Sequence, residues 1–198
     1  VTKISKPNPG DNVIVTGAAG GVGSLAGQIF KIAGCKVYGI AGGKEKCEML
    51  INDFGFDGAI DYKSEDLNES IGKLCPNGAD IVYDNVGGRI LNDCLLHLAL
   101  NARIAICGII SRHKTDNMNF GPENYSNLIF KRATMQGFLM LDYVSETASA
   151  RSKMKKWIEE GKLICKEDLR EGFENAPDTL KGLFDGKNKG KQLLKIAD

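Results

Sequence analysis

Short apolar runs alternate with amphipathic segments through most of the chain. The runs are rich in valine and isoleucine and seldom alternate with polar residues, a pattern that is typical of strands buried on both faces of a sheet. Strands are predicted at residues 12–16, 37–40, 59–62, 80–84, 103–108 and 134–141. Helical spacing separates most of these runs, so the pattern predicts an α/β fold built on a doubly wound parallel sheet.

Apolar residues recur with helical spacing between these strands. After the first strand they stand at positions 22, 25, 26, 29, 30 and 33, and Gly34 is placed to end that helix. Further helices are predicted at 44–54, 65–74, 91–98, 126–132 and 145–160. The last of these helices is expected to bury one face, which is formed by Ala150, Met154, Trp157 and Ile158.

The last part of the chain breaks the alternation. A strand-like stretch at 167–172 precedes a helical apolar face with Phe173, Leu180 and Leu183, and a closing strand follows at 191–197. We therefore divide the chain into a linker at 1–10, a sheet domain at 11–162 and a C-terminal segment at 163–198. The chain is expected to begin inside a longer protein, and its C-terminal segment is expected to return to another domain.

A glycine-rich turn joins the first strand to the first helix. Its glycines stand at 17, 20 and 23, and a second register, Gly21-Val22-Gly23 followed by Ala26, reads G-x-G-x-x-A. Such a turn brings backbone N–H groups and a helix N-terminus close to a pyrophosphate, as in dinucleotide-binding βα units. Glycine at strand-to-helix turns also has a purely steric explanation, so this motif alone leaves nucleotide binding open.

Other candidate binding segments follow the remaining strands. In a parallel sheet, ligands bind at the carboxyl ends of the strands, which places the segments 17–23, 42–46, 84–88 and 107–111 along one rim. The second strand ends without the acidic residue that holds the ribose of NAD, and Gly42, Gly43, Lys44 and Lys46 follow it instead. Small residues leave room for a 2′-phosphate and a lysine can pair with it, so NADP is predicted rather than NAD. Alternatively, the lysines form a solvated helix start.

Composition narrows the class of protein. The 198 residues are 42% hydrophobic and carry a formal net charge of +1, which favours neither nucleic acid nor a membrane surface as a partner. The six cysteines form no C-x-x-C pair, and several stand at core-like positions. They are interpreted as reduced thiols, which predicts a cytoplasmic protein without a disulfide framework or a metal site. Neither a signal peptide nor an apolar run of membrane-spanning length is visible.

Several motifs, in order, resemble those of the zinc-independent medium-chain dehydrogenases/reductases, in the branch of prostaglandin reductase, plant 2-alkenal reductase and bacterial curcumin reductase. The matching segments are 18–24, 39–47, 61–63, 84–88, 107–111, 137–138, 171–177 and 186–191. The resemblance implies a Rossmann-type cofactor domain and a C-terminal segment that completes a GroES-like catalytic domain. That catalytic domain is expected to be missing from this chain, because residues 1–10 match the linker that follows it.

The resemblance also implies roles for individual residues. It places Gly20, Gly21, Val22 and Gly23 around the pyrophosphate, Lys46 and Tyr62 beside the 2′-phosphate next to Gly42, and Asn85 under the cofactor. It places Cys107, Gly108, Ile109 and Ser111 along the approach to the nicotinamide, and Phe138, Leu139, Met140 and Asn188 around the cofactor. Simpler interpretations stay open: Tyr62 caps a strand, Cys107 is a core thiol, 138–140 is ordinary strand, and Asn188 belongs to a plain turn.

The reaction implied by the resemblance is NADPH-dependent reduction of the C=C bond of α,β-unsaturated ketones and aldehydes. Hydride adds to the β-carbon, and the enolate that forms is protonated at the α-carbon. The alternatives are a quinone oxidoreductase of the zeta-crystallin-like branch and a non-catalytic NADP-binding module. Because the catalytic domain is expected to be missing, the chain alone should bind NADP without necessarily turning over substrate. The family often forms dimers, which implies a homodimer.

One position departs from the family pattern. The family usually has Ser-x-Tyr after the fifth strand, and its tyrosine contacts cofactor and substrate, whereas this chain has Ser111-Arg112-His113. His113 is therefore the candidate catalytic donor, since an imidazole can donate a hydrogen bond and titrates near neutrality. A solvated loop histidine is the simpler alternative.

Overall fold

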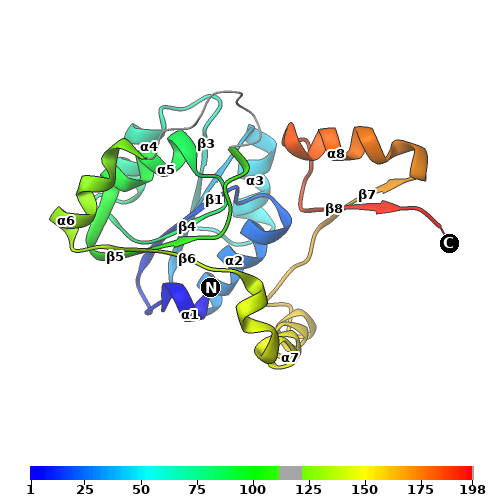
Figure 1. Ribbon diagram of the computed structural model, residues 1–198, viewed down its shortest axis with the longest axis horizontal. Coiled ribbons are helices and arrows are strands. Elements are labelled where there is room, and N and C mark those ends of the chain that lie inside the picture. Colours follow the sequence, from blue (N-terminus) through cyan, green and yellow to red (C-terminus); the bar gives the residue numbers. More distant parts are fainter. Residues whose placement is uncertain (112–121, 198) are drawn as a thin grey trace.

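The computed structural model describes residues 1–111 and 122–197, and its centre is a parallel six-stranded sheet (Figure 1). The strand order is β3-β2-β1-β4-β5-β6, which confirms the predicted doubly wound sheet. The strands are β1 (Asn12–Thr16), β2 (Lys36–Ala41), β3 (Gly58–Asp61), β4 (Ala79–Asp84), β5 (Leu98–Ile106) and β6 (Thr134–Gly137). The order reverses between β1 and β4, which creates the topological switch point at which ligands bind in such sheets.

Helices cover both faces of the sheet. The α-helices of the described residues are α1 (Thr2–Ser5), α2 (Gly21–Ile32), α3 (Lys44–Asn52), α4 (Leu67–Leu74), α5 (Gly88–Cys94), α6 (Asn127–Lys131), α7 (Thr147–Glu159) and α8 (Ala176–Phe184), of which α8 belongs to the C-terminal segment. Helices α2 and α3 contribute to one buried cluster, and α4 and α5 contribute to the other. Successive residues of β1 enter opposite clusters, Val13 and Val15 on one side and Ile14 on the other, because side chains alternate along a strand.

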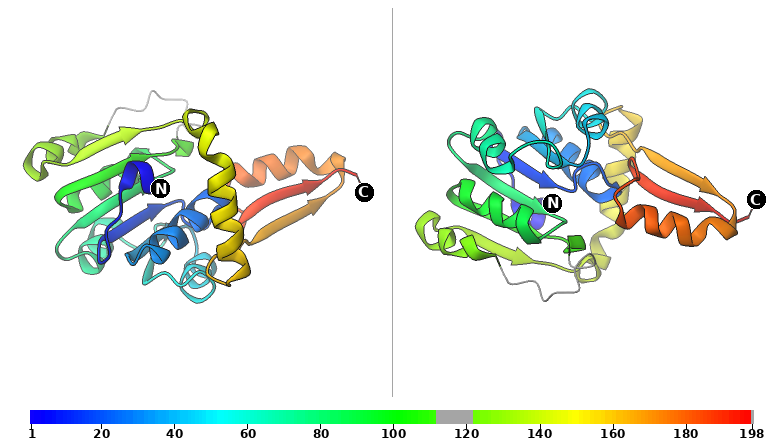
Figure 2. Two further views of the ribbon diagram at one scale, coloured as in Figure 1. Left: turned by 90° about the horizontal axis from the view of Figure 1, so that it is seen from below. Right: turned by 90° about the horizontal axis from the view of Figure 1, so that it is seen from above.

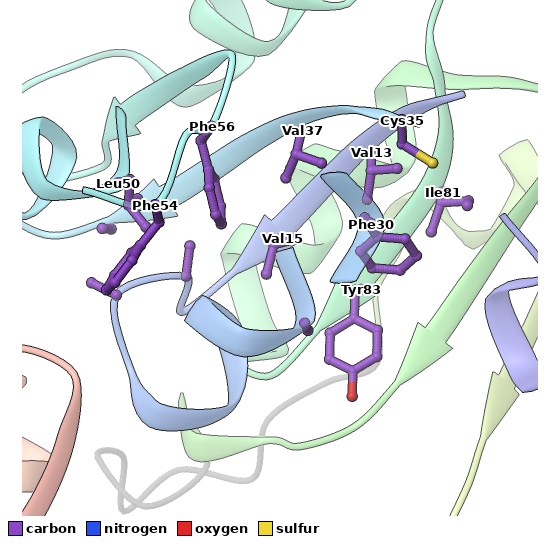
Figure 3. Close-up of a cluster of buried hydrophobic side chains, with 14 of the residues drawn as sticks. Val13, Val15, Phe30, Cys35, Val37, Leu50, Phe54, Phe56, Ile81 and Tyr83 are labelled. Carbon is purple, nitrogen blue, oxygen red and sulfur yellow. The ribbon is translucent and has the colours of Figure 1, made fainter. Parts of the chain in front are cut away.

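The cluster under α2 explains how that helix is held against the sheet (Figure 3). The Phe30 ring is fully buried and meets the Tyr83 ring of β4 edge-on, with the ring centroids 6.0 Å apart. Burying an aromatic side chain of this size contributes about 2 kcal/mol. The N-terminal turn of α2 is therefore presented at a fixed place on the rim of the sheet.

Three expectations about local structure are wrong. Leu98 is expected in a helix, but it begins β5. A short 3-10 turn (Leu95–His97) precedes it, and the three-residue spacing from Leu95 to Leu98 fits that turn as well as a helix. Strand β6 ends at Gly137 instead of 141, and a 3-10 segment (Met140–Glu146) follows it. No residue of α7 is fully buried. Of the expected apolar face, Met154 and Trp157 are half-buried, and Ala150 and Ile158 are exposed.

The C-terminal segment forms a separate layer that projects beyond the sheet domain (Figures 1 and 2). It consists of β7 (Glu167–Glu171) paired in parallel with β8 (Lys191–Lys195), and of α8. The buried Gln28 of α2 attaches this segment to the sheet domain, because its amide exchanges two hydrogen bonds with the backbone of Ile164, at 2.7 and 3.0 Å. Phe173, Leu180 and Leu183, which form the apolar face predicted for this segment, are exposed.

No helix in the described part of the chain is long and apolar enough to cross a membrane.

Candidate functional site

The glycine turn after β1 has the tight geometry of a phosphate cradle. Gly17 adopts a left-handed φ of 58°, which favours glycine. A Cβ atom on Gly23 would overlap the carbonyl oxygen of Gly17 and lie 2.8 Å from Ala18 Cα. Gly20 precedes α2, and among the described residues no side chain caps the first N–H groups of that helix. The helix therefore presents the positive end of its dipole to the rim.

Tyr62 and Lys63, just after β3, lie over Gly42. A Cβ atom on Gly42 would be 2.8 Å from Lys63 Cε and 2.9 Å from Tyr62 Cε1, so only glycine lets these side chains approach. Lys63 also lies near enough to Lys46 to lower its pKa, although burial has the larger effect. The structure thus brings Tyr62 and Lys63 against Gly42 and places Lys63 near Lys46. The sequence did not single out Lys63, which reaches this place because β3 pairs with β2.

Asp61 joins the loop after β2 to the loop after β3. Its carboxylate accepts hydrogen bonds from the backbone N–H of Gly43 at 2.7 Å and of Lys63 at 3.0 Å. Burial favours the neutral acid, but these bonds and one from the Ser64 hydroxyl outweigh it and lower the pKa of Asp61. The loops after β2 and β3 are therefore held at a fixed separation by a charged side chain.

The nicotinamide side of the predicted site is built by the loops after β4 and β5. Asn85 follows β4 at the switch point, and its amide donates to the carbonyl of Thr16 at 2.7 Å, so the side chain is turned toward β1. Cys107 is half-buried, and a Cβ atom on Gly108 would lie 3.0 Å from Asn85 O. The Ser111 hydroxyl donates to Val86 O at 2.6 Å. The predicted residues 107–111 thus pack directly against the loop after β4.

The segment after β6 carries the next predicted residues. The Phe138 ring is half-buried against Tyr83, with centroids 6.3 Å apart, whereas Leu139 and Met140 are 66% and 64% exposed. Ile109 and Val22 are also exposed. Residues 138–140 do not form ordinary strand core, because β6 has already ended.

The segment that carries Asn188 returns to the glycine turn. Asn188 is buried, and its amide donates to Gly190 O at 2.9 Å. The Gly190 N–H donates to Ala19 O at 2.9 Å, and a Cβ atom on Gly21 would lie 2.8 Å from Lys191 Cδ. The Lys46 ammonium donates to Gly186 O at 2.6 Å. The segment 186–191 therefore contacts both the glycine turn and the Lys46 side chain.

Two further observations concern the predicted site. His113 lies outside the described residues. Within residues 1–111 and 122–197, no three His, Cys, Asp or Glu side chains are grouped so that they could hold a metal ion.

Comparisons with known proteins agree with this geometry. The family described as zinc-binding dehydrogenase matches residues 21–158. The NADPH-dependent curcumin reductase of Escherichia coli is 38% identical over 98% of this chain and 58% of its own length. The NADP(+)-dependent 2-alkenal reductase of Nicotiana tabacum is 41% identical over 98% of this chain and 57% of its own length. The crystal structure of CurA from Vibrio vulnificus in complex with NADPH has a TM-score of 0.94 at 40% identity, covering 100% of this chain and 60% of CurA.

This chain thus spans less than two thirds of the length of the relatives that it matches. The family match covers most of the chain, from α2 onward, and includes every strand of the sheet except β1. It confirms the resemblance inferred from the motifs. The chain belongs to the zinc-binding dehydrogenase family of medium-chain dehydrogenases/reductases, and it corresponds to the cofactor-domain part of the branch that holds the curcumin and 2-alkenal reductases.

Proposed function

We propose that this chain binds NADP(H) along the carboxyl edge of its sheet. The observation that carries the proposal is the glycine turn, where the missing side chain of Gly23 lets the start of α2 pack directly on the backbone of Gly17 and Ala18, so that the helix N-terminus lies at the rim. Lys46 and Lys63 supply two cations for a 2′-phosphate, and Tyr62 lies with Lys63 over Gly42. The residues present therefore fit the cofactor.

We propose further that the complete enzyme reduces the C=C bond of α,β-unsaturated ketones and aldehydes. Support comes from the names of relatives that are 38% and 41% identical to this chain. When bound, NADPH supplies the hydride for the β-carbon. The loops at 85–88 and 107–111 would orient the nicotinamide half, and the apolar residues 138–140 would exclude water from it. Zinc independence is proposed from the branch to which the chain belongs, and no step of the proposed reaction uses a metal ion.

Two measurements test these proposals. Calorimetric titration of the chain is expected to show saturable NADPH binding that is about tenfold tighter than NADH binding. The absence of saturable binding would contradict the cofactor proposal. Turnover is measured as NADPH oxidation by the full-length gene product with 2-alkenals and with quinones. Faster oxidation with quinones favours a quinone oxidoreductase, and binding without any oxidation favours a non-catalytic NADP-binding module.

We propose a homodimer that forms through the edge of the sheet. Strand β6 is the last strand in the sheet order, and the adjoining α6 carries Ile129 and Phe130, which are 73% and 67% exposed. An open strand edge beside apolar side chains is a favourable surface for a second copy. Sedimentation velocity is expected to show a dimer that Phe130→Glu converts to monomer. A wild-type chain that stays monomeric at all concentrations would contradict the proposal.

The proposal also divides the chain into three parts. Residues 1–10 are a linker, residues 11–162 are the cofactor domain, and residues 163–198 would pack against the catalytic domain. The exposed Phe173 and Leu180 on this projecting layer support that assignment.

We propose a cytoplasmic location. It is supported by Cys35, Cys75 and Cys94, which are buried as small apolar side chains.

A further inference from the structure

The Asp84 carboxylate, at the end of β4, is completely buried beneath the rim of the site. It accepts hydrogen bonds from the Thr16 hydroxyl at 2.6 Å and from the Gly87 N–H at 2.9 Å, with a longer bond from the Val86 N–H. Burial raises the pKa of Asp84, and these bonds oppose the shift. Among the described residues it forms no salt bridge. The carboxylate is thus directed at the backbone of the loop that follows it.

The Thr16 hydroxyl has a second bond that extends this network. Its oxygen accepts the backbone N–H of Asn85 at 2.9 Å while it donates to Asp84. Thr16 is the last residue of β1 and directly precedes the glycine turn. One hydroxyl therefore joins the ends of the two strands that flank the switch point.

The loop after β5 is attached to the same turn. The N–H groups of Cys107 and Gly108 donate to Asp84 O, and the Ser111 N–H donates to Val86 O at 3.1 Å. Gly87 and Gly88 have left-handed φ values, and a Cβ atom on Gly88 would lie 3.0 Å from the Ser111 hydroxyl. Any shift of the turn at 85–88 consequently moves the loop at 107–111 with it.

Doubly wound sheets bind a dinucleotide in two halves, and the loops after β4 and β5 belong to the half that holds the nicotinamide mononucleotide. On the basis of the proposed NADP function, we propose that Asp84 and Thr16 are positioning residues for the nicotinamide half of the cofactor. They act through the backbone of residues 85–88 and 107–111, and they do not touch the adenosine half. Lys46 and Lys63 follow β2 and β3, and these two strands lie on the side of β1 that is opposite to β4 and β5.

Asp84→Asn tests this inference because it keeps the shape of the side chain and replaces one acceptor with a donor that opposes the donors around it. The probes are NADPH and adenosine 2′,5′-bisphosphate, which occupies only the adenosine half. We expect NADPH affinity to fall about tenfold, with the affinity for the bisphosphate changed less than about twofold. Equal losses for both probes, or no loss for NADPH, would overturn the inference.

A second pair of variants covers the case in which Asp84→Asn fails to fold. Thr16→Val removes the hydroxyl at nearly constant volume, and Thr16→Ser retains it as the matched control. Thr16→Val is expected to weaken NADPH binding severalfold and selectively, whereas Thr16→Ser restores wild-type binding. If Thr16→Ser weakens binding as much as Thr16→Val, the hydroxyl network has no positioning role.

The wild-type chain separates failure of this inference from failure of the proposed function. If neither probe binds the wild type, the NADP proposal is wrong and the inference fails with it. If both probes bind the wild type and the variants lose them in parallel, NADP binding stands and only the positioning role is wrong. Thermal unfolding of each variant is recorded beside the titrations, because a purely structural role would lower the melting temperature without selectivity between the probes.

Discussion

Gly23→Ala is expected to abolish measurable NADPH binding and to destabilise the chain by about 2 kcal/mol or more. The added methyl group would overlap the carbonyl oxygen of Gly17 and approach Ala18 Cα to 2.8 Å. Both contacts are with backbone atoms of the turn, so no side chain can rotate away to make room. The turn and the first residues of α2 must separate, which moves the helix N-terminus from the phosphate position.

Two further glycines provide matched controls for this variant. A Cβ atom on Gly27, in the middle of α2, would overlap the Phe56 ring in the core and not the phosphate turn. Gly27→Ala should therefore lose stability while the folded fraction still binds NADPH. No heavy atom lies within 4 Å of a Cβ atom on Gly137, so Gly137→Ala should be close to neutral. Urea unfolding and calorimetry measure the two effects, and NADPH binding retained by Gly23→Ala would contradict the assignment of the turn.

These glycines show which features the sequence predicts well. The spacing of Gly17, Gly20 and Gly23 is local, and a turn between a buried strand and a helix imposes the same steric demands wherever it occurs. The doubly wound sheet was likewise predictable, because buried strands and amphipathic helices alternate with different periods. Features that depend on only a few consecutive residues can thus be predicted from the sequence alone.

Features that depend on residues far apart in the chain could not be identified in this way. The Thr16–Asp84 bond joins positions 68 residues apart, and the Lys46–Gly186 bond joins positions 140 residues apart. Nothing near Asp84 in the sequence shows that its carboxylate will be directed at the backbone of its own loop. Lys63 is a further example, because its nearness to Lys46 follows from the pairing of β2 with β3.

The errors in local structure have a related cause. Helical spacing from Leu91 through Leu98 predicts a continuous helix, yet Leu98 gains a place in the core by joining β5. The apolar residues of α7 also have helical spacing, and the helix forms, but nothing in the described part of the chain buries that face. Periodicity indicates which side of an element is apolar, and tertiary packing decides whether that side is covered.

Lys46→Ala is expected to remove most of the preference for NADPH over NADH. The Lys46 ammonium is partly buried beside Gly42 and Lys63, where its single described partner is the carbonyl oxygen of Gly186, at 2.6 Å. A neutral carbonyl compensates the charge only weakly, so a 2′-phosphate would be the stronger partner. Loss of a charge-assisted hydrogen bond should weaken NADPH binding by up to about tenfold, which is most of the expected preference over NADH.

NADH is the internal control for this variant, because it lacks the 2′-phosphate and should bind Lys46→Ala as it binds the wild type. Lys44→Ala is the matched substitution: Lys44 lies two residues away on the same helix, and its exposed ammonium is 3.7 Å from Glu48. That variant should leave both affinities unchanged, since an exposed ion pair of this kind contributes little. If Lys46→Ala weakens NADPH and NADH equally, Lys46 serves to hold the segment at Gly186 in place, and the 2′-phosphate must be recognised elsewhere.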